Sequence, residues 1–99
     1  MSLSMLQKHN TKRELRANIE LAGLSVSDIA RDLDTTEDYV LRVLDLRSGC
    51  LEDPWIVKEY LCDVLSEQHK ETIAFTALAG DYRQYWFLDA SKIDARMLG

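Results

Sequence analysis

The chain has 99 residues, of which 46% are hydrophobic and 29% are charged. These values are typical of one globular domain and exclude a disordered chain. The formal net charge is −5, so any nucleic-acid binding would need a local basic face rather than a basic total. No apolar run reaches the length of a membrane span, no basic-then-apolar leader is visible, and two cysteines are too few for a disulfide framework. We therefore expect a single cytoplasmic domain over residues 1–99 that does not enter a membrane.

The first predicted helix covers residues 12–22. Its start is indicated by Thr11-Lys12-Arg13-Glu14, which has the spacing of a capping box. Leu15, Ile19 and Ala22 recur at helical spacing and are expected to point inward.

Residues 25–44 have the spacing of a helix-turn-helix. Val26, Ile29, Ala30 and Leu33 fall at positions 0, +3, +4 and +7, which is one face of an α-helix. After a short break the pattern resumes at Val40, Val43 and Leu44. The spacing predicts helices over about 26–33 and 36–46, joined by a short polar turn.

Two residues fit the helix-turn-helix geometry in particular. Ala30 is small and stands where the two helices would cross closely. Asp34 occupies the usual place of the turn glycine, and aspartate tolerates the left-handed conformation better than most residues. Residues 12–46 are thus predicted to form a helix-turn-helix core. The alternative is a helical hairpin that only fills a hydrophobic core.

A fourth, longer helix is predicted over residues 54–68. Asp53-Pro54 is a start signal, an N-cap followed by proline at the first helical position. Val57, Leu61, Val64 and Leu65 share one face, which Trp55, Ile56 and Tyr60 widen. So broad an apolar surface is expected to be central in the fold or shared with a partner.

The tail, residues 73–98, is rich in aromatic side chains, with five of the eight aromatics of the chain between positions 75 and 87. We expect short helical turns, a brief extended piece near 86–88 and a final helix over about 92–98. The aromatics have three interpretations: they close a small core, they form a homodimer surface, or they line a small-molecule pocket.

The predicted fold is therefore all-α, with a small three-helix core containing a helix-turn-helix, a long fourth helix and an aromatic-rich C-terminal segment. One shared core is expected to contain Leu15, Ile19, Ile29, Ala30, Leu33, Val40, Val43, Leu44, Val57, Leu61 and Val64.

Two segments, Leu51–Leu61 (LEDPWIVKEYL) and Phe75–Leu88 (FTALAGDYRQYWFL), resemble a family of small bacterial proteins catalogued only as a domain of unknown function. The resemblance extends from about Thr11 to Met97. It implies a bacterial, cytoplasmic protein that is a complete unit of about this length. It implies no activity, cofactor or site residue.

The sequence does not predict an enzyme. It contains none of the common catalytic or phosphate-binding motifs, and its two histidines, His9 and His69, lie near opposite ends of the helical part. Cys62 and His69 share a helix face, but two ligands without a third do not make a zinc site. We therefore expect no catalytic residue, no metal and no cofactor.

The first functional hypothesis is transcription regulation through double-stranded DNA. The third helix would enter the major groove, with Arg42 able to contact guanine or a phosphate. The residues expected to contact DNA are Lys12, Arg13, Arg16, Thr35, Thr36 and Arg42. Against this, Glu37, Asp38 and Asp45 bring negative charge towards a polyanion, although Glu37 and Asp38 also suit the first turn of a helix.

The second hypothesis is an acidic, homodimeric interaction (adaptor) domain that keeps the helix-turn-helix shape without binding DNA. Tyrosine and tryptophan are favoured at the centres of protein interfaces. The expected dimer contacts are Trp55, Tyr85, Trp86 and Phe87. A homodimer would suit both hypotheses, since paired recognition helices can meet two half-sites. The sequence does not identify any other protein partner.

Overall fold

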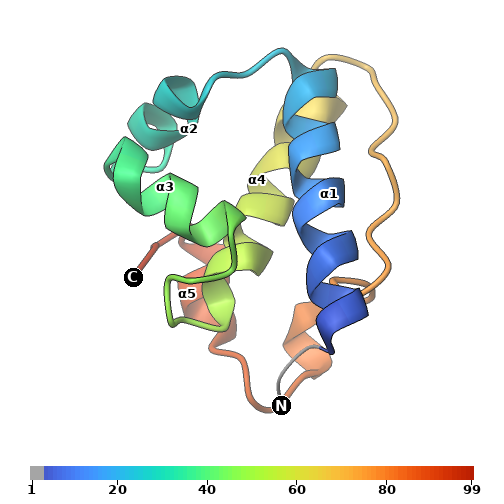
Figure 1. The fold of residues 1–99 in the computed structure, drawn as a ribbon, viewed down its shortest axis with the longest axis vertical. Helices are drawn as coiled ribbons and strands as arrows, with labels where there is room; N and C mark the ends of the chain where they lie inside the picture. The colour runs from blue at the N-terminus through green and yellow to red at the C-terminus, as the bar shows by residue number, and fades with distance from the viewer. Residues whose placement is uncertain (1–3) are drawn as a thin grey trace.

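The computed structural model describes residues 4–99. Its elements, drawn in Figure 1, are α1 (Met5–Ala22), α2 (Val26–Asp32), α3 (Glu37–Leu44), α4 (Glu52–Glu67), a 3-10 helix η1 (Tyr82–Gln84) and α5 (Ala90–Asp94). Because the described residues contain no strand, the all-α prediction is confirmed. Residues 86–88 form a turn and a bend rather than the extended piece expected there.

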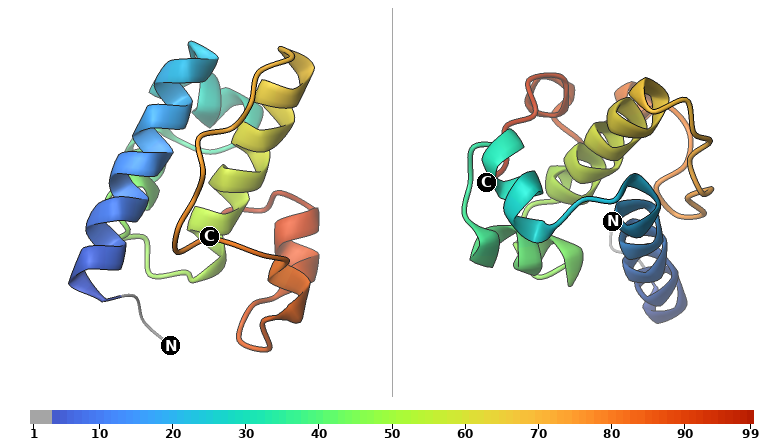
Figure 2. Two further views of the ribbon diagram at one scale, coloured as in Figure 1. Left: turned by 90° about the vertical axis from the view of Figure 1, so that its right-hand side faces the viewer. Right: turned by 90° about the horizontal axis from the view of Figure 1, so that it is seen from above.

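The two longest helices, α1 and α4, pack side by side, and the shorter helices α2 and α3 lie on one side of them (Figure 1). Helix α5 packs against α4. After α4 the chain returns along the outside of α1 without regular structure, as the left view of Figure 2 shows. This return places the aromatic tail near the end of the molecule at which α1 begins.

Helix α1 begins seven residues earlier than the predicted start at residue 12, so that boundary was wrong. Ser4 is the N-cap: its side chain accepts a hydrogen bond from the Gln7 amide, and the Gln7 side chain accepts one from the Ser4 amide. Thr11, the expected cap, lies inside the helix, where its hydroxyl donates to the Gln7 carbonyl at 2.7 Å. Both residues have capping-box spacing, and the helix uses the earlier one.

The starts of α2 and α3 agree with the sequence to within one residue. Ser25 and Asp28 form a reciprocal capping box at the start of α2. The side chain of Thr36 caps α3 by accepting from the Tyr39 amide at 3.2 Å. Each cap satisfies a helix N–H group that has no partner within the helix.

The predicted starts of the fourth and last helices need correction. Helix α4 begins at Glu52, with Leu51 at the N-cap position and no side-chain cap, whereas Asp53 is fully buried. The last helix covers Ala90–Asp94 instead of 92–98, because Asp89, rather than Ser91, caps it. An earlier cap brings the helix start forward by two residues.

The core contains the predicted apolar residues with one partial exception. The buried members are Leu15, Ile19, Ile29, Ala30, Leu33, Val40, Val43, Leu44, Val57 and Leu61. Val64 is half-buried and packs against this cluster. The tail adds Phe75, Leu78, Tyr82 and Leu88 to the same cluster. Part of the aromatic tail therefore closes the core, as the first of its three interpretations requires.

Two buried polar side chains of α1 hold the returning tail. Asn18 accepts from the Ile73 amide at 2.8 Å and donates to the Ile73 carbonyl at 3.1 Å. Glu14, which is 5% exposed, accepts from the amide and the hydroxyl of Thr76, each at 3.0 Å. These contacts supply hydrogen bonds to a segment that has no helix or sheet of its own.

Tyrosine–aspartate hydrogen bonds join the helices at two further places. Tyr39 of α3 donates to the buried Asp53 of α4, which also accepts from the Gly99 amide at 3.0 Å. Tyr60 of α4 donates to Asp32 of α2. Burial, and then the hydrogen bond to a carboxylate, raises the pKa of Tyr39 and of Tyr60 above the ordinary tyrosine range. Both hydroxyls therefore stay protonated as donors at neutral pH.

Candidate functional site

The α2–α3 unit has the local geometry expected of a helix-turn-helix. Ala30 is 5% exposed and belongs to the core, and α2 packs against α3. Asp34 has φ of 54°, the left-handed conformation predicted for the turn. The Asp34 amide donates to the Arg31 carbonyl and the Thr35 amide to the Ala30 carbonyl, so α2 ends in a Schellman motif. This ending sets the direction in which α3 leaves the turn.

The exposed face of α3 changes in charge along its length. Glu37 and Asp38 form the exposed first turn, beside the half-buried Thr35 and the exposed cap Thr36. The second half of the helix exposes Leu41 and Arg42. Together with Asp45 and Arg47 these two residues line a shallow hollow. The acidic end of α3 is therefore its N-terminus, and its guanidinium groups lie towards its C-terminus.

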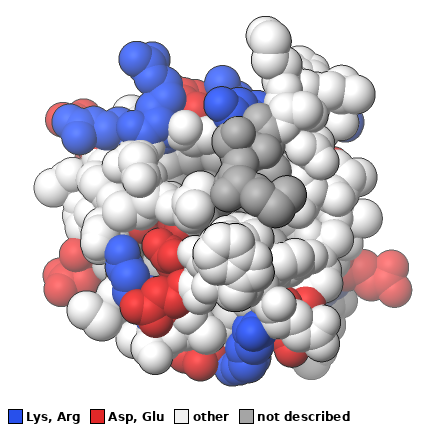
Figure 3. All heavy atoms as spheres, turned by 90° about the horizontal axis from the view of Figure 1, so that it is seen from below, with Lys and Arg blue, Asp and Glu red and all other residues white. Residues whose placement is uncertain are grey.

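The basic residues of α1 approach the C-terminal end of α3. Arg16 makes an ion pair of 3.5 Å with Asp45, and both side chains are about half exposed. Lys12 is half-buried, and Arg13 is exposed and donates to Asn10 at 3.4 Å. Seen from the end at which α1 begins, Lys and Arg side chains gather along one edge of the molecule (Figure 3). Arg16 thus neutralises one of the acids that weighed against DNA binding.

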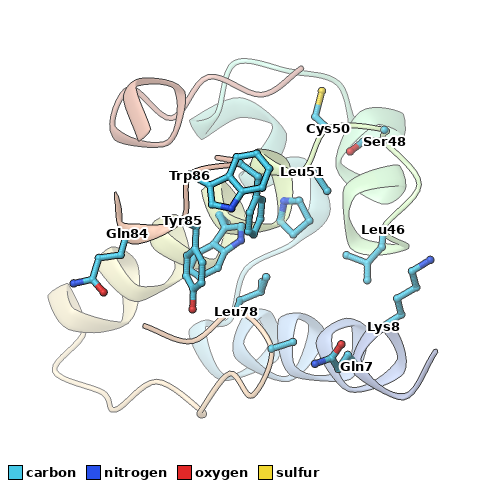
Figure 4. Close-up of a pocket in the computed structure, with 15 residues that line it drawn as sticks. Gln7, Lys8, Leu46, Ser48, Cys50, Leu51, Leu78, Gln84, Tyr85 and Trp86 are labelled. Carbon is cyan, nitrogen blue, oxygen red and sulfur yellow. The ribbon is translucent and has the colours of Figure 1, made fainter. Parts of the chain in front are cut away.

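A second candidate site is a hollow of about 580 Å³ between the start of α1, the α3–α4 loop and the tail. Figure 4 shows Trp86 and Tyr85 on one side of it and Leu46 and Lys8 on the other. The other lining residues are Gln7, Ser48, Gly49, Cys50, Leu51, Pro54, Trp55, Ala77, Leu78, Gln84 and Phe87.

The four aromatic residues expected at a dimer surface all line this hollow, but they differ in exposure. Trp55 is 5% exposed, so it belongs to the core of its own chain and has little surface to lose to a partner. Phe87 is half-buried, Tyr85 is 36% exposed and Trp86 is 88% exposed. The rings of Trp55 and Tyr85 lie 5.5 Å apart between centroids, and those of Trp86 and Phe87 lie 5.9 Å apart.

Sequence reasoning missed most of the other lining residues. No pattern in the sequence assigned a functional role to Lys8, Leu46, Leu51 or Gln84. The walls come from three segments far apart in the chain, and no periodic pattern links such segments.

The cysteine and histidine side chains do not converge on a metal or catalytic site within residues 4–99. No group of three or more metal-ligating side chains occurs in this part of the chain. Cys50 and Cys62 are free thiols, each half-buried. The Cys50 sulfur lies 4.0 Å from the Lys92 ammonium, on the side turned away from the hollow (Figure 4). None of the described helices has the length and apolar character needed to cross a bilayer.

A family model described as an uncharacterised protein conserved in bacteria, DUF2316, matches residues 1–89. The chain belongs to this family. The resemblance inferred from LEDPWIVKEYL and FTALAGDYRQYWFL is thereby confirmed. No curated protein and no solved structure matches the chain. Membership of DUF2316 assigns no activity, so a function has to be argued from the two surfaces described above.

Proposed function

We propose that this DUF2316 protein is a cytoplasmic bacterial transcription regulator that binds double-stranded DNA through α3. The observation that carries the proposal is the α2–α3 unit, in which the two helices pack together, Ala30 is buried in the core, and Thr36 and Arg42 stay exposed. In helix-turn-helix proteins the second helix occupies the major groove. Arg42 pairs with no carboxylate of residues 4–99, so its guanidinium is available to a base edge or a phosphate.

The charge distribution predicts how DNA would be held. Glu37 and Asp38 repel phosphates at the start of α3, whereas Arg42 and Arg47 lie near its end. Lys12 and Arg16 lie four residues apart on α1, and Arg16 reaches Asp45. Phosphate contacts would therefore concentrate at α1 and the C-terminal half of α3. With so few cations, binding should be weak and should fall with added salt.

Arg42→Ala is expected to weaken DNA binding by about 1–3 kcal/mol, because a guanidinium that contacts a base edge contributes about that much. Arg16→Ala should weaken binding to all sequences alike, since a phosphate contact does not depend on sequence. Fluorescence anisotropy at low salt with a panel of labelled duplexes of different defined sequences measures both effects.

Arg83→Ala is the matched control, because it removes the same charge from η1, outside α1–α3. It should leave the affinity for DNA unchanged. Absence of binding at about 100 μM protein in low salt would refute the DNA proposal, since even non-specific binders associate in this range.

The exposure of Trp86 favours one other function, a homodimeric interaction domain. Its side chain is 88% exposed, and Leu51 at the same hollow is 48% exposed. Met5 and Leu6, at the start of α1, are 88% and 69% exposed. Exposed apolar side chains gathered at one end of a small protein are typical of an interaction surface.

Sedimentation at micromolar concentration tests this second candidate. A dimer held by the aromatic tail would have twice the 11.4 kDa chain mass, and Trp86→Ala would return it to the monomer. Tyr39→Phe, which changes an aromatic residue of α3 that does not line the hollow, should leave the dimer intact. A parent protein that sediments as a monomer would exclude the homodimer.

A further inference from the structure

The hollow has the size and position of a small-molecule site. Its volume of about 580 Å³ falls within the range of about 300–1,000 Å³ found for ligand pockets. One wall is the start of α1, a second is the loop from Leu46 to Pro54, and the third is the tail from Ala77 to Phe87. Pockets of this kind are typically apolar, with a few polar groups near the mouth.

The apolar wall is formed by aromatic rings. Centroid distances are 5.5 Å for Trp55–Tyr85, 5.6 Å for Tyr85–Phe87 and 5.9 Å for Trp86–Phe87. These spacings are those of offset or edge-to-face ring packing, which a further flat ring could extend. Trp86, at 88% exposed, has most of its surface left to cover. The wall therefore favours a planar aromatic molecule over a compact aliphatic one.

The charge around the hollow is opposite to that of the whole chain. The chain has 17 Asp and Glu residues, yet the described residues that line the hollow include Lys8 and no carboxylate. Lys8 stands at the rim and pairs with no acid of residues 4–99 (Figure 4). Helix α1 also begins here, with no acid in its first turn, so its positive dipole end adds to the field of Lys8.

We propose that the hollow binds one small planar aromatic anion, such as an aromatic carboxylate or sulfonate. Its rings pack against Trp86 and Tyr85, and its charge lies at the rim beside Lys8. Gln7, which lines the hollow next to Lys8 (Figure 4), offers an amide donor to the same group. This inference goes beyond the proposed DNA binding and does not depend on it.

The test compares two probes with the same ring skeleton, 8-anilinonaphthalene-1-sulfonate and the uncharged N-phenyl-1-naphthylamine. Each is titrated into the full-length protein, and its own fluorescence and that of the protein's tryptophans are followed. The expected result is one site per chain, with a Kd for the sulfonate of roughly 20 μM, a usual value for a ligand of this size. The uncharged probe should bind about threefold more weakly, since a solvent-exposed ion pair contributes little.

Three variants assign the binding to this hollow. Trp86→Ala should weaken both probes by about tenfold, because it removes the most accessible ring of the wall. Lys8→Gln should weaken the sulfonate by about threefold and leave the uncharged probe unchanged. Lys12→Gln, one turn further along α1 and outside the lining, should change neither Kd. Far-ultraviolet circular dichroism and thermal melting verify that each variant is folded like the parent.

Several results would overturn the proposal. Equal affinity for the two probes in the parent would exclude an anion site. Undiminished binding in a folded Trp86→Ala variant would place the probes elsewhere, as would more than one site per chain. If the affinity for the probes falls as the protein concentration rises, the hollow is occupied by a second copy of the chain in a dimer. Loss of DNA binding alone affects none of these measurements, so the two proposals fail separately.

Discussion

Ala30→Glu is expected to destabilise the protein by about 4 kcal/mol or more, a large part of the total stability of a domain this small. The side chain of Ala30 is 5% exposed and belongs to the core between α2 and α3. Glutamate at this site adds four heavy atoms, three of which form a carboxylate that has no cation in the core to pair with it. Urea denaturation followed by circular dichroism measures the change in free energy of unfolding.

Ser27→Glu is the matched control for this experiment. It places the same new charge on α2, but at an exposed position near the N-terminus of the helix, where an acid is favourable. We expect a change within about 0.5 kcal/mol of the parent. An Ala30→Glu variant as stable as the parent would mean that the α2–α3 crossing is misplaced, and the DNA proposal would lose its structural basis.

The α2–α3 unit could be predicted from the sequence because its signals are local. Two runs of apolar residues at helical spacing define the buried faces, and Asp34 is one of the few residue types that enters the left-handed region easily. Ser25 and Asp28 also have capping-box spacing, and the structure uses them as the cap of α2. Periodicity, turn chemistry and capping all indicate the same structure here, which is when sequence reasoning succeeds.

The start of α1 shows where such reasoning fails. Ser4–Gln7 and Thr11–Glu14 both have capping-box spacing, and only the first is a cap. Thr11 and Glu14 lie on the buried side of α1, where Thr11 donates to a backbone carbonyl and Glu14 accepts from Thr76. Capping-box spacing alone therefore does not show whether two polar residues cap a helix or instead lie within it and form hydrogen bonds, some of them with a distant segment.

The hollow is the least predictable feature for a related reason. The sequence left three interpretations for the tail aromatics, which were closing a core, forming a dimer and lining a pocket. Different members of the set fit different interpretations. Tyr82 and Phe75 close the core, whereas Trp86 stays exposed at the hollow. The orientation of each aromatic ring depends on the position at which α1 holds the returning tail. This position is set by contacts between residues about 55–62 positions apart in the sequence.

Asn18→Ala is therefore expected to release the tail, with a loss of about 2 kcal/mol in the free energy of unfolding. The side chain of Asn18 is fully buried and pairs with both the amide and the carbonyl of Ile73. Alanine leaves these two backbone groups without their protein partner, and each part-buried group contributes about 1 kcal/mol. Because η1 and the aromatic wall follow this segment, the substitution should also loosen the hollow.

Amide hydrogen exchange separates this local release from general destabilisation. In Asn18→Ala, the protection of amides from exchange should fall most at residues 73–78. The amides of α2 and α3 should lose only the protection that corresponds to the decrease in the global free energy of unfolding. Asn10→Ala is the matched control, because Asn10 lies on the same helix and its side chain has, within residues 4–99, a hydrogen bond only from the exposed Arg13. It should change stability by less than about 0.5 kcal/mol. Unchanged exchange at residues 73–78 in Asn18→Ala would show that core packing of Phe75 and Leu78, rather than the asparagine, holds the tail on α1.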